Sequence, residues 1–176
     1  MQLVMFKGFP GSGKSTLSRA VSRQLHWPLI DKDDVKDMFS EQVPDAGGLA
    51  YNVMLNIVRR QLLQGLDVIC DSPMTHRITY EQAQNIAQKT HAQLVIIECF
   101  CSDEHLWSQR INARKTYGLP AHHVIDWETL QAYRHQQRTE ASFLITHPHL
   151  LVDTARPLAE CVSEVIDWLE HTTMLV

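Results

Sequence analysis

A glycine-rich stretch near the start of the chain carries the most specific chemical signal. In "GFPGSGKST", the residues Gly8, Gly13, Lys14 and Ser15 fit the pattern G-x-x-x-x-G-K-[ST], known as Walker A. Glycines let backbone N–H groups turn inward around phosphate oxygens, and the positive end of a following helix adds to the attraction. A strand-like apolar run precedes the pattern and a helix-like run follows it, as the pattern requires. We therefore expect this loop to bind a nucleoside triphosphate and Mg²⁺.

The positions of this loop have separate expected roles. Lys14 should reach the β- and γ-phosphates, and Ser15 should hold Mg²⁺. Thr16 is expected at the α-phosphate, although an ordinary helix position explains it almost as well. The residues expected to contact the nucleotide from this loop are Gly8, Pro10, Gly11, Ser12, Gly13, Lys14, Ser15 and Thr16.

Three acids follow the second strand-like run. "LIDKDDVK" places Asp31, Asp33 and Asp34 where a parallel sheet binds its ligands, outside the carboxyl ends of its strands. Phosphoryl transfer to an alcohol needs a carboxylate that orients the hydroxyl and accepts its proton. We predict Asp33 as this base and Asp31 as a second substrate contact, although spacing alone does not decide among the three acids. The alternative is that Asp33 or Asp34 only caps the next helix.

A further acid ends the third strand-like run, "DVICDSP". Asp71 is expected to bind Mg²⁺ directly or through water, although strands also end in aspartate for turn formation. Arg77 follows a few residues later. It is predicted to contact substrate or phosphate, with a solvated loop arginine as an equal alternative.

Two arginines share one face of a predicted helix in "HLWSQRINAR". Arg110 and Arg114 stand at i and i+4, with Trp107 and Ile111 expected on the packed side. Because guanidinium groups both stack on bases and bind phosphate oxygens, the pair is expected to grip the nucleotide. Arg114 is the predicted phosphate contact, and a solvated helix face is the alternative.

A turn-rich segment, "KTYGLPAHHV", follows this pair and predicts a lid over about residues 110–140. Arg134 and Arg138 repeat the i, i+4 spacing beyond it and are candidate substrate contacts. His122 and His123 are expected to be surface loop residues, because the chain has ten histidines and none shows metal-ligand spacing here.

The elements that position these residues follow from hydrophobic pattern. Five short apolar runs alternate with amphipathic helices, which predicts a three-layer α/β sandwich with a five-stranded parallel sheet and a small helical lid. Residues 1–176 are expected to form one domain that contains the lid. A helix is expected over "DDVKDMF", with Val35, Met38 and Phe39 on its apolar side, and "PDAGG" is expected to break it.

Bulk properties narrow the function classes. A formal charge of −4 disfavours a protein that coats nucleic acid. The sequence contains no run of 18 apolar residues, so no membrane span is expected. The N-terminus lacks the features of a signal peptide, so none is expected there. The four cysteines are expected to be buried free thiols, which fits a cytoplasmic location. They are Cys70, Cys99, Cys101 and Cys161.

Five motifs, in their order along nearly the whole chain, resemble those of small AAA-type P-loop kinases. They are "GFPGSGKST", "LIDKDDVK", "VICDSP", "SQRINAR" and "VDTARPL". The group includes adenylate-kinase-like, polynucleotide 5′-hydroxyl, zeta-toxin-like and adenylylsulfate kinases and antibiotic phosphotransferases. Its motif D-x-D-x-x-R implies Asp33 as base, with Lys36 where arginine is usual. The lid motif R-x-x-x-R implies that Arg110 covers adenine and Arg114 touches phosphate. The loop "DTARP" implies that Thr154 to Arg156 lie beside the base, whereas "DSPMTHR" departs from the D-A-T of polynucleotide kinases.

The resemblance and the motifs imply an ATP-dependent phosphotransferase that acts on a hydroxyl of a small-molecule or nucleotide-like acceptor. Lys14, Asp33 and Arg114 would carry the catalysis, with ATP and Mg²⁺ as cofactors. A polynucleotide 5′-hydroxyl kinase is the first alternative, and an ATPase or regulatory module without acceptor is the second. The sequence contains no N-K-x-D guanine motif. We expect a monomer or homodimer, and the acceptor is not specified.

Overall fold

The computed structural model describes residues 1–39, 43–117, 123, 125–140 and 143–173. The elements are β1 (Gln2–Lys7), α1 (Lys14–Leu25), β2 (Leu29–Asp31), α2 (Lys32–Lys36), α3 (Ala46–Leu62), β3 (Val68–Asp71), α4 (Arg77–Thr90), β4 (Gln93–Phe100), α5 (Glu104–Ala113), the 3₁₀ turn (Arg114–Thr116), α6 (Trp127–Glu140), β5 (His149–Asp153) and α7 (Leu158–Thr173). Each strand is followed by one helix or by two in succession, as after β2 and β4, and a 3₁₀ turn continues α5.

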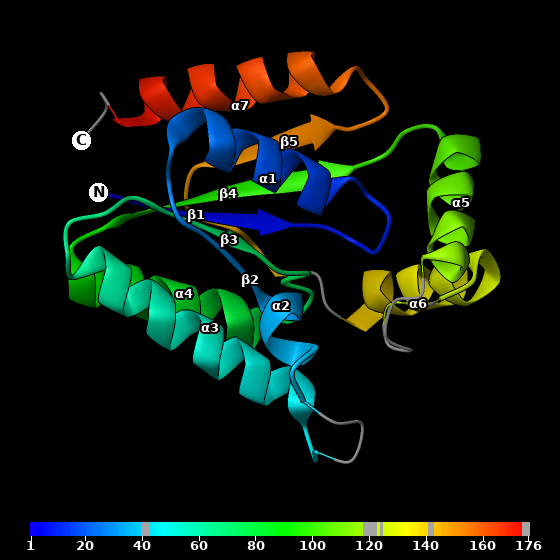
Figure 1. Ribbon diagram of the computed structural model, residues 1–176, viewed down its shortest axis with the longest axis horizontal. Helices are drawn as coiled ribbons and strands as arrows, with labels where there is room; N and C mark the ends of the chain where they lie inside the picture. Colours follow the sequence, from blue (N-terminus) through cyan, green and yellow to red (C-terminus); the bar gives the residue numbers. More distant parts are fainter. Residues whose placement is uncertain (40–42, 118–122, 124, 141–142, 174–176) are drawn as a thin grey trace.

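The five strands form one parallel sheet in the order β2-β3-β1-β4-β5. Helices α1 and α7 cover one face, α3 and α4 cover the other, and α5 and α6 lie beyond the carboxyl ends of the strands (Figure 1). The predicted three-layer α/β fold is therefore confirmed. Because the order reverses around β1, the loop after β1 lies at the switch point where such sheets bind ligands.

The central strand β1 shows why the sheet needs helices on both faces. Leu3 and Met5 pack with α3 and α4, whereas Val4 and Phe6 pack with α1 and α7. All four side chains are fully buried, because successive residues of a strand point to opposite faces. Burial on both sides anchors the end of β1, from which the glycine-rich loop starts.

The segment between β2 and α3 differs from the sequence prediction. Helix α2 ends at Lys36, and Met38 is 83% exposed, so its expected apolar position is wrong. The "PDAGG" motif was predicted to break a helix. It lies between α2 and α3, and it also contains the first residues of α3. Asp45 caps α3 by accepting a hydrogen bond from the Gly48 backbone N–H at 3.0 Å. A good capping acid thus outweighs the low helix propensity of glycine in the first turn.

Two further predictions concern the state of the cysteines and the absence of a membrane span. All four cysteines are buried and free, as predicted. Among the described residues, no helix has the length and apolar character to cross a bilayer.

Candidate functional site

The glycine-rich loop joins β1 to α1 in a conformation that its glycines permit. Gly11 and Gly13 have φ angles of 74° and 81°, in the left-handed region that other residues rarely adopt. Within the described part of the chain, the buried Ser12 hydroxyl has no hydrogen-bond partner. A buried donor of this kind needs an acceptor, and a phosphate oxygen would supply one. The loop therefore fits the predicted phosphate group.

Thr154, in the loop after β5, holds this glycine loop from the side. Its hydroxyl donates to the Ser12 carbonyl oxygen at 2.7 Å and accepts from Nη1 of Arg110 at 3.0 Å. Nη2 of Arg110 also donates to the Thr154 carbonyl oxygen at 2.8 Å. Helix α5 is further attached to the loop where Trp107 Nε1 donates to the Pro10 carbonyl oxygen at 2.8 Å. Two nucleotide-binding segments predicted separately are thus joined.

Gly13→Ala is expected to weaken ATP binding at least tenfold. An added Cβ would lie 2.7 Å from Thr154 Oγ1 and 2.8 Å from Thr154 Cβ, so the loop or its support must shift. The matched control is Gly65→Ala, because Gly65 has a φ of +85° but nothing within 4 Å of the added Cβ. Both variants bear backbone strain of about 1–3 kcal/mol, and only Gly13→Ala adds the collision. Titration calorimetry with an ATP analogue checks this, and equal affinities would contradict it.

Lys14 and Asp71 form an ion pair at the centre of the site. Asp71 is 0% exposed, and its second oxygen accepts a hydrogen bond from the Ser18 hydroxyl at 3.1 Å. A carboxylate this deeply buried requires a cation or donors around it. Asp71 therefore stands next to the glycine-rich loop with Lys14 and Ser18 as its partners, and its role in metal binding stays a prediction.

Asp31 is the N-cap of α2. Its Oδ1 accepts a hydrogen bond from the Asp33 backbone N–H at 2.9 Å, and Oδ2 accepts one from Nη2 of Arg19 at 3.1 Å. Its register partner on β3 is Asp71. Burial, followed by the charge of Asp71, raises the pKa of Asp31 above its ordinary value. Because Asp31 performs the capping, the alternative in which Asp33 or Asp34 caps this helix is wrong.

Asp33 does not cap the helix. Its side chain is 34% exposed and lies near Lys32 and His123. Its Oδ1 lies 2.6 Å from Nζ of Lys32, and its Oδ2 lies 3.8 Å from Nδ1 of His123. Burial acts to raise the pKa of Asp33, but the Lys32 hydrogen bond and the charges of Lys32, His123 and Lys14 outweigh it, and the pKa is lowered. Asp33 is thus held as a carboxylate beside the phosphate loop.

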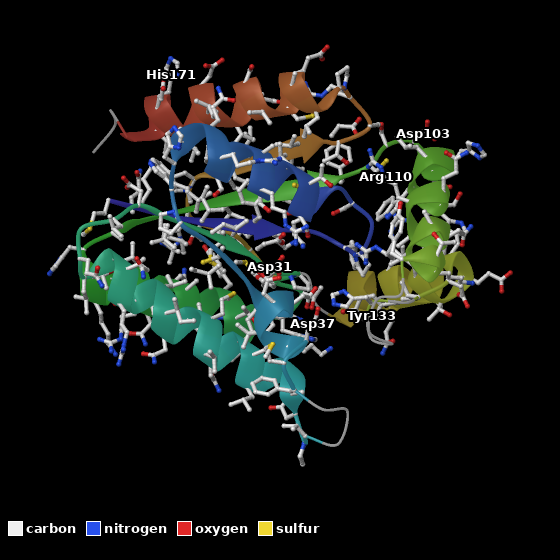
Figure 2. All side chains as sticks on the ribbon, in the orientation of Figure 1. Asp31, Asp37, Asp103, Arg110, Tyr133 and His171 are labelled. Carbon is white, nitrogen blue, oxygen red and sulfur yellow. The ribbon has the colours of Figure 1, made fainter. Side chains whose placement is uncertain are left out.

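Arg114 stands in the 3₁₀ turn that continues α5, with Trp107 and Ile111 of that helix buried as predicted. Burial lowers the pKa of Arg114, and the charges of Asp33 and Asp71 oppose this effect. The guanidinium group therefore lies in the electrostatic field of both site acids. Asp31 and Asp37, at either end of α2, lie at the same end of the sheet as Arg110 on α5 (Figure 2).

Other predicted arginines have partners away from these acids. Arg77 is exposed and pairs with Glu81 at 2.7 Å, and Arg156 pairs with Glu164 on α7. Arg134 packs over the Trp107 ring, 4.3 Å from its centroid. Thr16 is exposed in the first turn of α1. The side chain of Arg138 lies outside the described residues. The substrate contacts of Arg77, Arg134 and Arg138 and the nucleotide contact of Arg156 stay predictions.

Two residues of the site were missed by sequence reasoning. Lys32 was assigned no role, although its place between two acids in "DKDD" was a signal. His123 was expected to be a surface loop residue without a site role, but its side chain is only 14% exposed and its Nε2 lies 2.8 Å from Asp37 Oδ1. Only the fold brings it to α2, because 86 residues separate it from Asp37. His122 lies outside the described residues.

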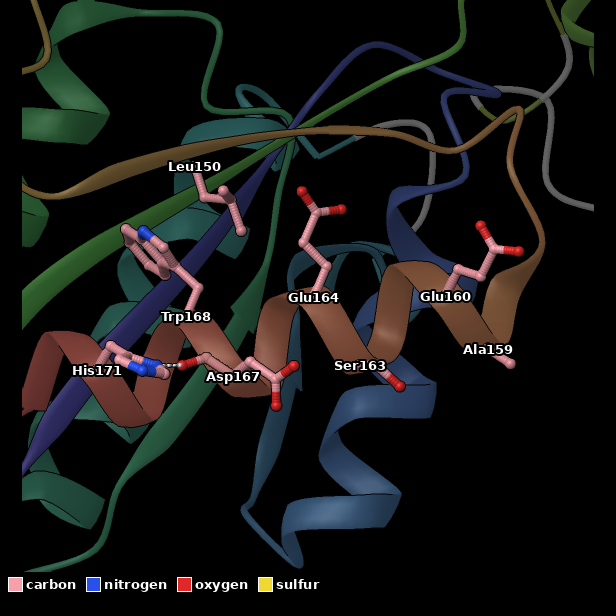
Figure 3. Close-up of a pocket in the computed structure, with 8 residues that line it drawn as sticks. All are labelled: Leu150, Ala159, Glu160, Ser163, Glu164, Asp167, Trp168 and His171. Carbon is pink, nitrogen blue, oxygen red and sulfur yellow. Dashed lines mark hydrogen bonds between the residues drawn. The ribbon is translucent and has the colours of Figure 1, made fainter.

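A concave surface elsewhere does not belong to this site. It is lined by Leu150 of β5 and by residues of α7, among them Trp168, Glu160, Glu164 and Asp167 (Figure 3). None of these residues was predicted to bind a ligand. Among the described residues, no group of three metal-binding side chains occurs. This is compatible with Mg²⁺, which is usually bound by one or two carboxylates together with phosphates and water.

Comparison with known proteins agrees with this geometry. Residues 3–139 match the AAA_33 family, described as an AAA domain. No curated protein matches. Among solved structures, a candidate kinase from Chloroflexus aurantiacus is 24% identical with a TM-score of 0.74, and 97% of each chain is covered.

Two further structures have the same fold. A gluconokinase from Sinorhizobium meliloti is 20% identical with a TM-score of 0.62, covering 97% of this chain and 92% of that one. APS kinase of Mycobacterium tuberculosis, in complex with AMPPNP and APS, is 17% identical with a TM-score of 0.68, covering 96% and 97%. At these identities the likeness concerns the fold. The chain therefore belongs to the AAA_33 family of AAA domains, and it has the fold of the small P-loop kinases.

Proposed function

We propose that this protein is an ATP-dependent phosphotransferase that moves the γ-phosphate of ATP to a hydroxyl group of a small-molecule or nucleotide-like acceptor. The observation that carries the proposal is the placement of Asp33. Its carboxylate is free of the helix cap and lies in the field of Lys14 and Arg114. A base beside the phosphate loop is the feature that an acceptor-directed kinase needs and a simple nucleotide-binding module does not.

The residues of the chain would divide the reaction between them. Asp33 would accept a hydrogen bond from the acceptor hydroxyl and take its proton as the new oxygen–phosphorus bond forms. The bond between the γ-phosphorus and the bridging oxygen breaks in the same step, and ADP leaves. Lys14 and Arg114 would stabilise the negative charge on the transferred group and on the leaving oxygen, as preorganised cations do in phosphoryl transfer.

Ser15 and Asp71 would hold Mg²⁺, and the ion would neutralise charge on the β- and γ-phosphates. The ion pair between Lys14 and Asp71 supports this arrangement. When Lys14 turns to the phosphates, the buried Asp71 carboxylate needs another cation, which Mg²⁺ would supply. Arg110, held by Thr154, would flank the adenine.

The acceptor is a hydroxyl compound of moderate size in this proposal. The gluconokinase and APS kinase folds support a hydroxyl acceptor by likeness. A 5′-hydroxyl polynucleotide is the alternative acceptor, which the net charge of −4 disfavours.

Transfer of ³²P from labelled ATP tests the proposal. The acceptor panel contains nucleosides, sugars and sugar acids, antibiotics and 5′-hydroxyl oligonucleotides, with Lys14→Ala as the inactive control. We expect slow hydrolysis of ATP alone and stimulated turnover, with labelled product, for one class. Label on the oligonucleotides alone would favour the polynucleotide kinase. ATP turnover that no acceptor stimulates and that Asp33→Asn does not change would favour the module without acceptor.

A further inference from the structure

Lys32 occupies an unusual position for a lysine. Its side chain is only 9% exposed, and its ammonium group lies 2.6 Å from Asp33 Oδ1 and 5.7 Å from the centre of the Tyr51 ring. The Tyr51 hydroxyl in turn accepts a hydrogen bond from the Met74 backbone N–H at 3.1 Å. This connects α2, α3 and the loop after β3 in one continuous set of contacts that ends at the candidate base.

Local structure does not account for this contact. Lys32 is the first residue of α2, where the partial positive charge of a helix end disfavours a cation. Consecutive residues of a helix also do not face each other, so the pairing of Lys32 with Asp33 is not a product of spacing. A contact from another helix accompanies the pair, because the ammonium group lies over the Tyr51 ring of α3. Local preferences are overridden here by the tertiary structure.

A gain in protein stability does not explain the ion pair between Lys32 and Asp33 either. Burying an ion pair costs desolvation energy that its attraction only roughly repays, so an apolar side chain of similar size often serves stability equally well. The arrangement does have a geometric effect. Oδ1 of Asp33 is occupied by Lys32, whereas Oδ2 lies 3.8 Å from Nδ1 of His123, which is beyond hydrogen-bond distance. The charges of Lys14, Lys36 and Arg114 also act on this carboxylate.

We propose that Lys32 is a positioning residue for the phosphotransferase reaction: its ammonium group, which lies over the Tyr51 ring, holds Oδ1 of Asp33 so that Oδ2 faces the incoming hydroxyl group. This inference rests on the proposed function of Asp33 as base. Lys32 itself touches neither nucleotide nor acceptor. Its contribution should therefore appear in turnover and not in ATP affinity, and it should vanish when Asp33 can no longer act as a base.

The experiment measures ATP hydrolysis under single-turnover conditions, with water as the probe that takes the place of the acceptor hydroxyl. The variants are Lys32→Met, Lys32→Arg, Asp33→Asn and the double variant of Lys32→Met with Asp33→Asn. Lys89→Met, which removes an exposed lysine at the end of α4, is the matched control. Affinity for a non-hydrolysable ATP analogue and the unfolding temperature are measured for each variant.

Lys32→Met is expected to lower the hydrolysis rate about 10- to 100-fold, because loss of alignment at a reacting group has effects of this size. Its affinity for the ATP analogue should change less than about threefold. Lys32→Arg, which keeps the cation, should recover most of the rate, and Lys89→Met should equal the wild type. The double variant should be no slower than Asp33→Asn alone.

Three results would overturn the inference. They are a wild-type rate for Lys32→Met, a similar loss for Lys32→Arg and Lys32→Met with unchanged unfolding temperatures, and an equal further loss when Lys32→Met is added to Asp33→Asn. If Asp33→Asn alone keeps the wild-type rate, the proposed function of Asp33 fails instead, and the inference about Lys32 fails with it. Should Lys32→Met lower the unfolding temperature, Lys32→Arg decides between loss of the positioning contact and loss of the fold.

Discussion

Lys14→Ala is expected to lower ATP affinity about 10- to 100-fold and phosphoryl transfer by a further factor of about 10² or more. Hydrogen bonds to charged groups contribute about 1.5–3 kcal/mol, which corresponds to the loss in affinity. The further loss in rate reflects charge stabilisation that is made only in the transition state. Titration calorimetry with an ATP analogue and single-turnover kinetics separate the two effects. Unchanged affinity would contradict the assignment of the loop.

The same substitution should also destabilise the protein, which needs a control. It leaves the fully buried Asp71 without its cation, and a broken buried ion pair costs about 3–5 kcal/mol. Combining Lys14→Ala with Asp71→Asn removes the unpaired charge and should restore much of the unfolding temperature. ATP binding should stay weak in this double variant. Recovery of both properties would show that Lys14 serves the fold alone.

Asp33→Asn is expected to leave nucleotide binding nearly intact and to lower turnover by about 10²- to 10⁴-fold, the usual contribution of a general base. The amide keeps the size of the carboxyl group but cannot accept the proton. Asp34→Asn is the matched control, because Asp34 is exposed on the same short helix. Turnover by stopped-flow or label transfer checks the prediction. Retained turnover in Asp33→Asn, or an equal loss in Asp34→Asn, would remove Asp33 from the role of base.

The pH dependence of Asp33 gives a second measurement. Its pKa in the folded protein is below the ordinary value of 3.8, because the hydrogen bond and charge of Lys32 outweigh burial. The active form is the carboxylate, so a lowered pKa keeps Asp33 active toward lower pH. Titration of the side-chain carboxyl group by NMR should give a midpoint below 3.8. A midpoint near neutral pH would contradict the geometry around Lys32.

Elements that depend on consecutive residues were predictable from the sequence. The strand β1, the glycine loop and the start of α1 follow one another without a break, so pattern and context could be checked together. The packed face of α5 followed from the spacing of Trp107 and Ile111, because helical periodicity places such residues on one side. The capping of α2 was less predictable, since four acids lie within or beside it and only backbone geometry selects Asp31.

By itself, the sequence determined the α/β class, the position of the glycine-rich loop between β1 and α1, and the group of acids at the ends of β2 and β3. These features depend on local pattern and on the rule that parallel strands end at one edge. Only the tertiary structure decided which partners those side chains have. It placed the Lys32 ammonium group over the Tyr51 ring, brought His123 to Asp37 across 86 residues, and joined Arg110 to the glycine loop through Thr154. The physical reason is that long-range contacts depend on how helices pack on the sheet, which residue spacing along the chain does not specify.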